Sequence, residues 1–200
     1  PGGVPRFAEV AQLAGVQATD WSWAPLLADL DDDGRRDLFV TNGIWRRPND
    51  LDYINYVGNE AVQARMAQGG GTADLEVATR MPQVRIPNHA FRNAGGLRFA
   101  DAGRAWGLDD AGFSNGAAYA DLDDDGALDL VVNRLGAPAG VYRNRARART
   151  AHGWLTVALR GGGKNTQGIG ARVLVYSRAA GAQLAEQSPV RGFLSSVDPR

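Results

Sequence analysis

The fold is decided by the stretch Asp29-Leu30-Asp31-Asp32-Asp33-Gly34-Arg35-Arg36-Asp37. A second stretch carries nearly the same pattern, Asp121-Leu122-Asp123-Asp124-Asp125-Gly126-Ala127-Leu128-Asp129. The match extends upstream, because Phe7 and Phe99 each lie 22 residues before the first aspartate of the stretch that follows. The two segments therefore form an internal repeat that aligns without a gap.

Each acidic stretch has the composition of a calcium loop. Its five carboxylates lie within nine residues and repel one another unless a cation lies among them, and calcium prefers about six to eight oxygen ligands. The glycine at position six permits the sharp turn that brings the later oxygens round. We expect position four, Asp32 or Asp124, to face solvent. The expected ligands are Asp29, Asp31, Asp33, Asp37 and the Arg35 carbonyl in the first loop, and Asp121, Asp123, Asp125, Asp129 and the Ala127 carbonyl in the second.

Two other interpretations of these stretches were weighed. An EF-hand ends its loop with a bidentate glutamate at position twelve and has flanking helices. Here position twelve is Val40 or Val132, and the apolar runs 38–40 and 130–132 predict strands. A hydrated acidic turn is the other alternative, since Asp and Gly are ordinary turn residues. Four carboxylates at fixed spacing, twice, favour the metal loop.

Composition indicates a globular chain with 44% hydrophobic and 22% charged residues. No apolar run is long enough to cross a membrane, so membrane insertion is not expected. The absence of cysteine excludes disulfides and thiolate metal sites. Loops of this type bind calcium where it is plentiful, which predicts an extracellular or periplasmic location.

The net charge of zero hides a division along the chain. Residues 1–133 hold 11 arginines against 20 acidic residues, whereas residues 134–200 hold 11 basic residues against two acidic ones. The first region therefore carries −9 and the second +9, which indicates two differently built parts.

A second landmark, an Arg-Asn pair, follows each acidic loop at Arg92-Asn93 and Arg143-Asn144. Asn93 lies 64 residues after Asp29, but Asn144 lies 23 residues after Asp121, so the first unit contains about 41 additional residues. The additional segment, residues 45–85, has helical spacing and a capping residue at Asn49 or Asp50. We expect short helices there, two of them separated by glycines 69–71.

These repeats resemble the FG-GAP or VCBS repeat of integrin-type β-propellers. The resemblance rests on Phe-x-(Glu/Asp), a following glycine, and Ala-Asp-Leu-Asp-Asp-Asp-Gly-x-x-Asp-Leu. Residues 112–121, Gly-Phe-Ser-Asn-Gly-Ala-Ala-Tyr-Ala-Asp, are similar to the version in the cartilage acidic protein family. The resemblance implies a mainly β fold containing a partial propeller of about two blades, with the helical insertion inside the first.

The same family joins its propeller to a small C-terminal β domain called ASPIC/UnbV. Residues 165–171 resemble the signature Asn-x-x-Gly-Ile-Gly-Ala of that domain, and residues 192–196 resemble its next landmark. We expect strands at residues 154–159 and around Val173 and Val175. The implied domains are propeller repeats at 1–145 and an ASPIC/UnbV-like domain at 146–200. A closed propeller needs about four to eight blades, so the chain is expected to be a fragment with a truncated second domain.

No catalytic motif is visible. His89 and His152 are the only histidines, and neither Ser114 nor Ser195 has a nearby histidine or the Gly-x-Ser-x-Gly context of a hydrolase. Residues 161–164 lack the serine or threonine of a phosphate-binding loop. The arginines alternate at positions 143, 145, 147 and 149, so an extended backbone would place them on one side, where they could grip an anionic polymer. A solvated linker between domains is the favoured interpretation, because no interleaved aromatic residues provide stacking.

We therefore expect a module that binds calcium and acts as a binding or adhesion scaffold, rather than an enzyme. Its partner would be an unknown protein or glycan, and nucleic acid is not expected. The alternatives are a part of a polysaccharide-acting enzyme, and binding of an anionic polymer through the basic C-terminal region.

Overall fold

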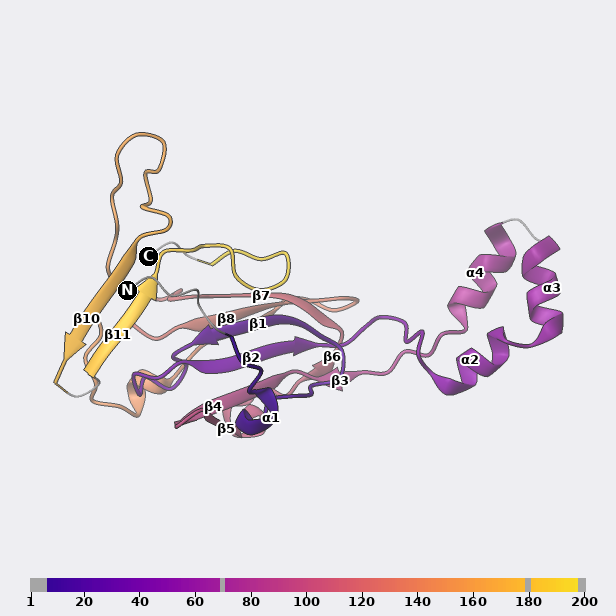
Figure 1. The fold of residues 1–200 in the computed structure, drawn as a ribbon, viewed down its shortest axis with the longest axis horizontal. Coiled ribbons are helices and arrows are strands. Elements are labelled where there is room, and N and C mark those ends of the chain that lie inside the picture. Colours follow the sequence, from indigo (N-terminus) through magenta and orange to yellow (C-terminus); the bar gives the residue numbers. More distant parts are fainter. Residues whose placement is uncertain (1–6, 69–70, 179–180, 198–200) are drawn as a thin grey trace.

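The computed structural model describes residues 7–68, 71–178 and 181–197 (Figure 1). Within these ranges the chain is mainly β, as predicted. All strand pairs are antiparallel, and none of the sheets closes into a ring within the described ranges.

Two sheets form the body of the molecule. The first has four strands in the order β1 (Ser22–Ala28), β2 (Asp37–Asn42), β4 (His89–Gly95) and β5 (Arg98–Asp101). The second has three strands in the order β7 (Ser114–Ala120), β8 (Asp129–Arg134) and β9 (Gly140–Tyr142). Two short strands, β3 (Ile86–Pro87) and β6 (Ala111–Gly112), pair with each other.

The sequence repeat is also a structural repeat. Ala28 pairs with Asp37 at the end of the β1–β2 hairpin, and Ala120 pairs with Asp129 at the end of the β7–β8 hairpin. Each acidic stretch therefore connects two antiparallel strands, and the predicted strands 38–40 and 130–132 lie in β2 and β8. Both hairpins also have a register irregularity toward the open end.

The hydrophobic core lies between the two large sheets, where β1 packs beside β7. Phe39 of β2 and Val132 of β8 are fully buried, and each such side chain contributes about 1.5–3 kcal/mol. This core fixes the two acidic hairpins relative to each other. The buried cluster consists of Ala24, Leu26, Ala28, Leu30, Phe39, Ala90, Leu108, Ala117, Leu130 and Val132.

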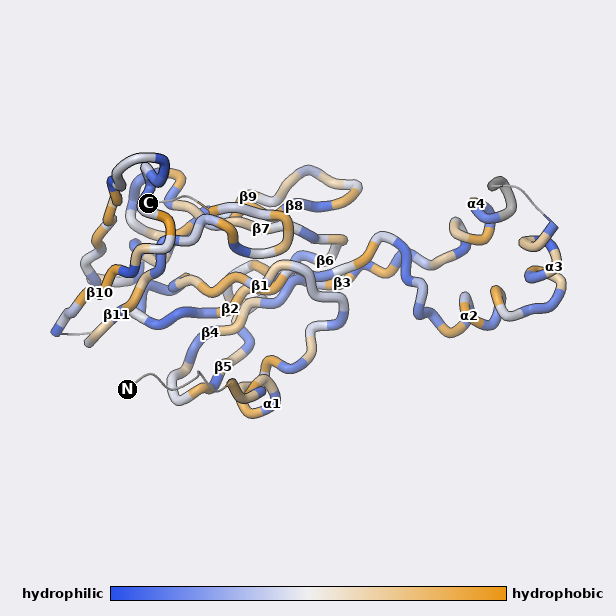
Figure 2. Tube along the Cα trace, turned by 45° about the horizontal axis from the view of Figure 1, so that its top comes forward, coloured by the Kyte–Doolittle hydropathy of each residue, from blue (hydrophilic) through white to orange (hydrophobic). Residues whose placement is uncertain are grey.

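The segment between β2 and β4 is helical, as predicted. It contains α2 (Leu51–Val57), α3 (Glu60–Gln68) and α4 (Gly71–Thr79), which project away from the sheets (Figure 1). The Asp50 carboxylate caps α2 by accepting the Tyr53 N–H at 3.0 Å. Figure 2 shows hydrophobic residues on α2 and α4. Two of the glycines expected to separate helices, 69 and 70, lie outside the described residues.

Three short helices complete the body: α1 (Ala11–Ala14), α5 (Gly103–Trp106) and the 3₁₀ helix η1 (Ala146–Ala148). The C-terminal region forms a hairpin of β10 (Arg172–Ser177) and β11 (Gly181–Glu186), so the strand expected around residues 173–175 is present. The chain then returns to the sheets, where the Phe193 ring lies 4.7 Å from the Trp23 ring. The predicted domain boundary at 145 and 146 stays a prediction.

One expectation for the C-terminal half is wrong. Residues 154–159 do not form a strand. Their alternating pattern suits one, but no described strand pairs with them, and the Trp154 side chain instead lies against Gly126. The arginine run 143–149 does not meet the condition of a fully extended backbone, because η1 turns the chain at residues 146–148.

Candidate metal centres

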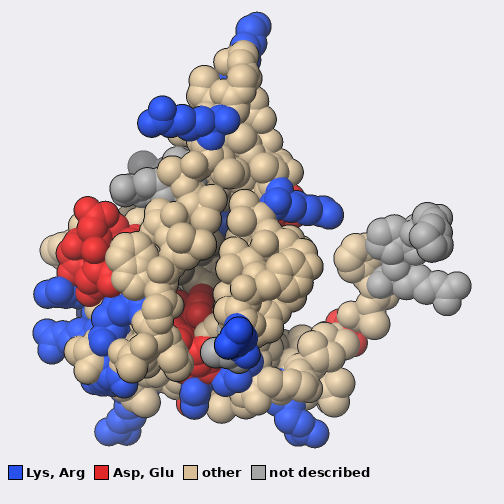
Figure 3. Space-filling view, turned by 90° about the vertical axis from the view of Figure 1, so that its left-hand side faces the viewer, with Lys and Arg blue, Asp and Glu red and all other residues tan. Residues whose placement is uncertain are grey.

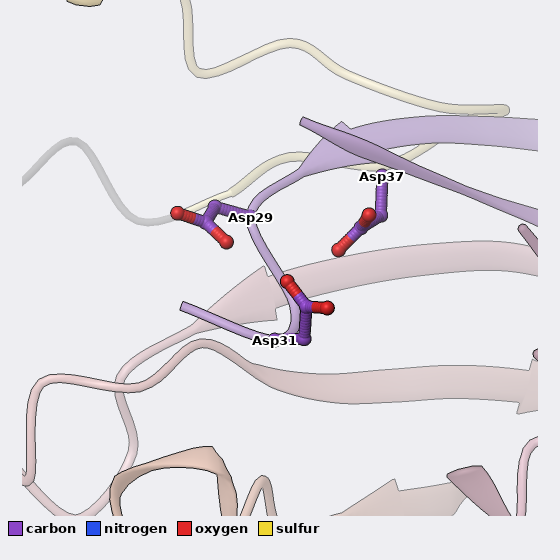
Figure 4. A group of neighbouring side chains, drawn as sticks. All are labelled: Asp29, Asp31 and Asp37. Atoms are coloured by element: carbon purple, nitrogen blue, oxygen red, sulfur yellow. The ribbon is translucent and has the colours of Figure 1, made fainter. Parts of the chain in front are cut away.

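The first acidic loop brings three carboxylates together at the end of the β1–β2 hairpin. Asp29, Asp31 and Asp37 each offer an oxygen atom, and these oxygens all lie within 4.8 Å of one another. Figure 4 shows the Asp31 and Asp37 side chains directed toward each other, with Asp29 beside them. Asp37 is fully buried, while Asp29 and Asp31 are partly buried. This separation suits oxygen ligands around one cation.

Backbone N–H groups hold two of these carboxylates in place. Asp29 accepts the Asp33 N–H at 3.1 Å and the Gly34 N–H at 2.8 Å. Asp37 accepts the Leu30 N–H at 2.9 Å and the Asn93 N–H at 2.8 Å. Such bonds fix the carboxylate orientations before any ligand arrives, which lowers the conformational cost of binding a cation.

The second loop has the same four hydrogen bonds at the equivalent positions, and we call this shared arrangement the carboxylate frame. Asp121 accepts the N–H groups of Asp125 and Gly126 at 3.0 and 2.9 Å. Asp129 accepts the N–H groups of Leu122 and Asn144 at 3.0 and 2.7 Å. The oxygens that lie within 4.8 Å of one another belong here to Asp121, Asp123 and Asp125.

Backbone conformation follows the repeat as well. Gly34 and Gly126, at position six, have φ angles of +87° and +88°, which confirms the sharp turn expected of these glycines. Position four also has a positive φ, +58° at Asp32 and +55° at Asp124. The shared backbone shape follows from the shared Asp-x-Asp-Asp-Asp-Gly pattern.

The two position-four aspartates differ in their surroundings. Asp124 is exposed, as predicted, but the Asp32 side chain is only 11% exposed, so the prediction is wrong for the first loop. The Arg147 Nε atom lies 3.4 Å from the Asp32 carboxylate, and the His152 Nδ1 atom lies 2.6 Å from the Asp32 carbonyl oxygen. Residues more than a hundred positions away therefore cover Asp32, a contact that no local pattern indicates.

Not all predicted ligands join the clusters. Asp33 lies outside the first group, and its carboxylate forms ion pairs with Arg35 and Arg92. Asp129 lies outside the second group, although it occupies the position of Asp37. The carbonyls of Arg35 and Ala127 stay predicted ligands.

Burial raises the pKa of three carboxyl groups in the first loop. Removal from water raises the pKa of Asp37 to about 6, against opposing hydrogen bonds from the Asn93 and Leu30 N–H groups. Burial likewise raises the pKa of Asp29, and the nearby Asp32 charge adds to the rise. The same effect raises the pKa of Asp32, which Arg147 opposes. A divalent cation would favour the ionised forms and reverse these shifts.

The Arg-Asn landmark has a structural role that the sequence did not reveal. The Asn93 side chain donates to the Arg36 carbonyl at 2.9 Å, and the Asn144 side chain donates to the Leu128 carbonyl at 3.1 Å. Together with the backbone bonds to Asp37 and Asp129, Asn93 ties β4 to the end of the first acidic loop, and Asn144 ties the segment after β9 to the end of the second. The recurrence of Arg-Asn after each loop was the available signal.

The C-terminal region lies over both loops. Gln183 of β11 donates to the Gly34 carbonyl at 3.1 Å, and the Arg36 side chain donates to the Leu184 carbonyl at 2.5 Å. The Arg147 side chain donates to the Gly126 carbonyl at 3.4 Å. Figure 3 shows acidic side chains on this face with Lys and Arg side chains beside them. The basic region is thus placed against the acidic one.

Comparison with known families gives one match. The family model described as ASPIC and UnbV matches residues 161–200, which include β10 and β11. This confirms the C-terminal part of the expected resemblance, over a fifth of the 200-residue chain. No curated protein matches the chain. Each helix within the described residues is too short or too polar to cross a lipid bilayer.

Proposed function

We propose that this chain is a calcium-binding module of FG-GAP or VCBS propeller repeats joined to an ASPIC/UnbV-like domain. It serves as a binding or adhesion scaffold, and its two acidic hairpin loops each hold one calcium ion. The observation that carries this proposal is the duplication of the carboxylate frame, in which both loops gather three carboxylate oxygens within 4.8 Å.

Calcium is favoured over other metals by the ligand chemistry. The grouped side chains offer oxygen atoms alone, which are the ligands that hard cations take. Loops that offer several carboxylates suit the higher and more variable coordination number of calcium better than the strict octahedron of magnesium. Weak loops of this kind are occupied where calcium is abundant, which supports a role outside the cytoplasm.

A scaffold role is supported by the way in which the loops join separate parts of the chain. The first loop contacts β11 through Gln183, and Arg147 contacts both loops. A bound ion would therefore stabilise the junction between sheets and C-terminal region. With free calcium about a hundredfold above the dissociation constant, each site would add about 2.7 kcal/mol to the free energy of unfolding.

Two other functions stay predictions. Polysaccharide turnover has no assigned acid and base pair. Binding of an anionic polymer would depend on Arg145 and Arg149, which are exposed, because Arg143 and Arg147 already contact acidic-loop residues. A heparin titration of wild type and Arg145→Gln with Arg149→Gln tests that alternative.

The proposal is tested by calorimetric titration with calcium. Wild type is expected to bind two ions, Asp31→Ala and Asp123→Ala one each, and the double variant none. Asp109→Ala, which removes an exposed carboxylate outside both loops, is the matched control and should bind two ions. Wild-type protein that binds no calcium at millimolar concentration would contradict the proposal.

A further inference from the structure

Each acidic loop already contains a cationic group, supplied by the arginine of the Arg-Asn landmark. The Arg92 Nε atom lies 2.5 Å from the Asp31 carboxylate, and its second nitrogen lies 3.3 Å from Asp33. In the second loop the Arg143 Nε atom lies 2.6 Å from the Asp123 carboxylate, with a second nitrogen 3.8 Å from Asp125. The same fork of donors therefore reaches positions three and five in both loops.

These are carboxylates that a calcium ion would need. A guanidinium group has donors and no lone pair to give a metal, so it cannot become a ligand. Its positive charge, held against Asp31 or Asp123, also repels an incoming cation. The arginine and the ion therefore compete for the same carboxylates.

The arginines are free to leave. The Arg92 side chain is 51% exposed and the Arg143 side chain is 66% exposed. An ion pair between exposed groups contributes little to stability, so displacing the guanidinium into water is not prohibitive. The carboxylates that do not contact these arginines, Asp29 and Asp121, are already held by backbone N–H groups. The frame thus does not depend on the arginine.

We propose that Arg92 and Arg143 are resident counterions that calcium must displace, and that they set the affinity and charge selectivity of the two sites. This inference rests on the proposed calcium function. A monovalent ion brings no more charge than the guanidinium it replaces, whereas a divalent ion brings twice as much. The arginines therefore weaken calcium binding and exclude sodium and potassium more strongly than calcium.

The opposite role would be a positioning one, in which each arginine holds the two carboxylates ready for the ion. The two roles differ in sign. Removing a positioning group weakens calcium binding, whereas removing a competitor strengthens it. Substitution by glutamine, which keeps a hydrogen-bond donor but removes the charge, separates them.

The experiment measures the calcium affinity of Arg92→Gln and of Arg143→Gln. Arg92→Gln is also combined with Asp123→Ala, and Arg143→Gln with Asp31→Ala, so that only the site next to the substituted arginine remains. The matched controls are Arg98→Gln and Arg145→Gln, which remove an exposed charge from nearby positions that form no ion pair with the loops among the described residues. Circular dichroism establishes that each variant is folded.

Arg92→Gln and Arg143→Gln should each bind calcium about tenfold more tightly than the matched control at the site next to the substituted arginine. The calcium affinity of these two variants should also become more sensitive to sodium chloride. Unchanged or weaker affinity, with wild type still binding two ions, would overturn this inference and leave the calcium function standing. Absence of binding in wild type and in every variant would reject both together.

Discussion

The two acidic loops have the same frame and different surroundings. In both, an aspartate at position one accepts two backbone N–H groups and an aspartate at position nine accepts two more. Yet Asp31 and Asp33 are 19% and 15% exposed, whereas Asp123 and Asp125 are 34% and 27% exposed. The repeat specifies the frame, and segments outside the repeat determine how deeply it is buried.

Nearby arginines account for a second difference. In the first loop, Arg35 and Arg92 pair with carboxylates of the predicted ligand set, and Arg147 pairs with Asp32. In the second loop, Ala127 occupies the position of Arg35, and Arg143 forms ion pairs with Asp123 and Asp125. We therefore expect the second loop to bind calcium more tightly than the first.

The largest expected effect is the loss of the shared frame. Asp37→Ala leaves the buried Leu30 and Asn93 N–H groups without their acceptor, which should lower the free energy of unfolding by about 3 kcal/mol. Asp129→Ala removes the matching bonds and should give a similar loss. Urea unfolding without calcium measures both. A loss below 1 kcal/mol in either variant would break the equivalence of the two loops.

The next effect depends on the Trp154 ring, which lies against Gly126 in the second loop. A Cβ atom on Gly126 would lie 2.4 Å from the Trp154 ring and would occupy a backbone position with φ of +88°. Gly126→Ala should therefore cost about 2–3 kcal/mol and shift the tryptophan fluorescence. Gly34→Ala, with φ of +87°, should cost at least about 1 kcal/mol from backbone strain. Unchanged tryptophan fluorescence in Gly126→Ala would contradict the contact with Trp154.

The third effect is a pH dependence that arises in the first loop. Burial raises the pKa of Asp37 from 3.8 to about 6, so the folded state binds this proton more tightly than the unfolded state. The resulting stability is fully present below about pH 4 and is lost as the pH rises through about 6. Without calcium, the part lost between pH 4.5 and pH 7.5 should amount to about 2 kcal/mol.

Melting curves at pH 4.5 and pH 7.5 for wild type and Asp37→Asn check this effect. Because the amide does not titrate, the variant should lose that part of the pH dependence. Calcium should reverse the trend, since binding requires ionised Asp37 and a proton competes for it. A calcium affinity of the first loop that is unchanged between pH 7.5 and pH 5 would count against Asp37 as a ligand.

The smallest effect concerns the arginine that contacts both loops. The Arg147 and Asp32 side chains are 16% and 11% exposed, so Arg147→Gln leaves a largely buried carboxylate without its ion pair. We expect a loss of about 1 kcal/mol, because Asp32 relieves part of the cost by binding a proton. Arg149→Gln removes an exposed charge two residues later and should change stability little. Thermal unfolding of the two variants side by side measures the difference.

Local patterns in the sequence predicted local structure well. The Asp and Gly spacing predicted the hairpin loops, and the apolar runs 38–40 and 130–132 predicted β2 and β8. The capping residue expected at Asn49 or Asp50 is Asp50, at the start of α2. Each of these depends on residues within one or two turns of chain, so the pattern contains most of the relevant physics.

Contacts between distant segments were not predictable in the same way. Arg92 reaches Asp31 across 61 residues, and His152 reaches Asp32 across 120. The prediction of a strand at residues 154–159 was wrong for a related reason. The alternating pattern is typical of a strand, but a strand also needs a neighbouring strand to pair with, and the tertiary fold determines whether one is present. The repeated Arg-Asn pair marked a shared role without showing what the arginine contacts.

The most direct measurement is anomalous diffraction from crystals of the wild-type protein grown with calcium. The account predicts two anomalous peaks, one among Asp29, Asp31 and Asp37 and the other among Asp121, Asp123 and Asp125, with the Arg92 and Arg143 guanidinium groups moved out. Ordered loops without a peak, and with both arginines still seated on their carboxylates, would contradict it.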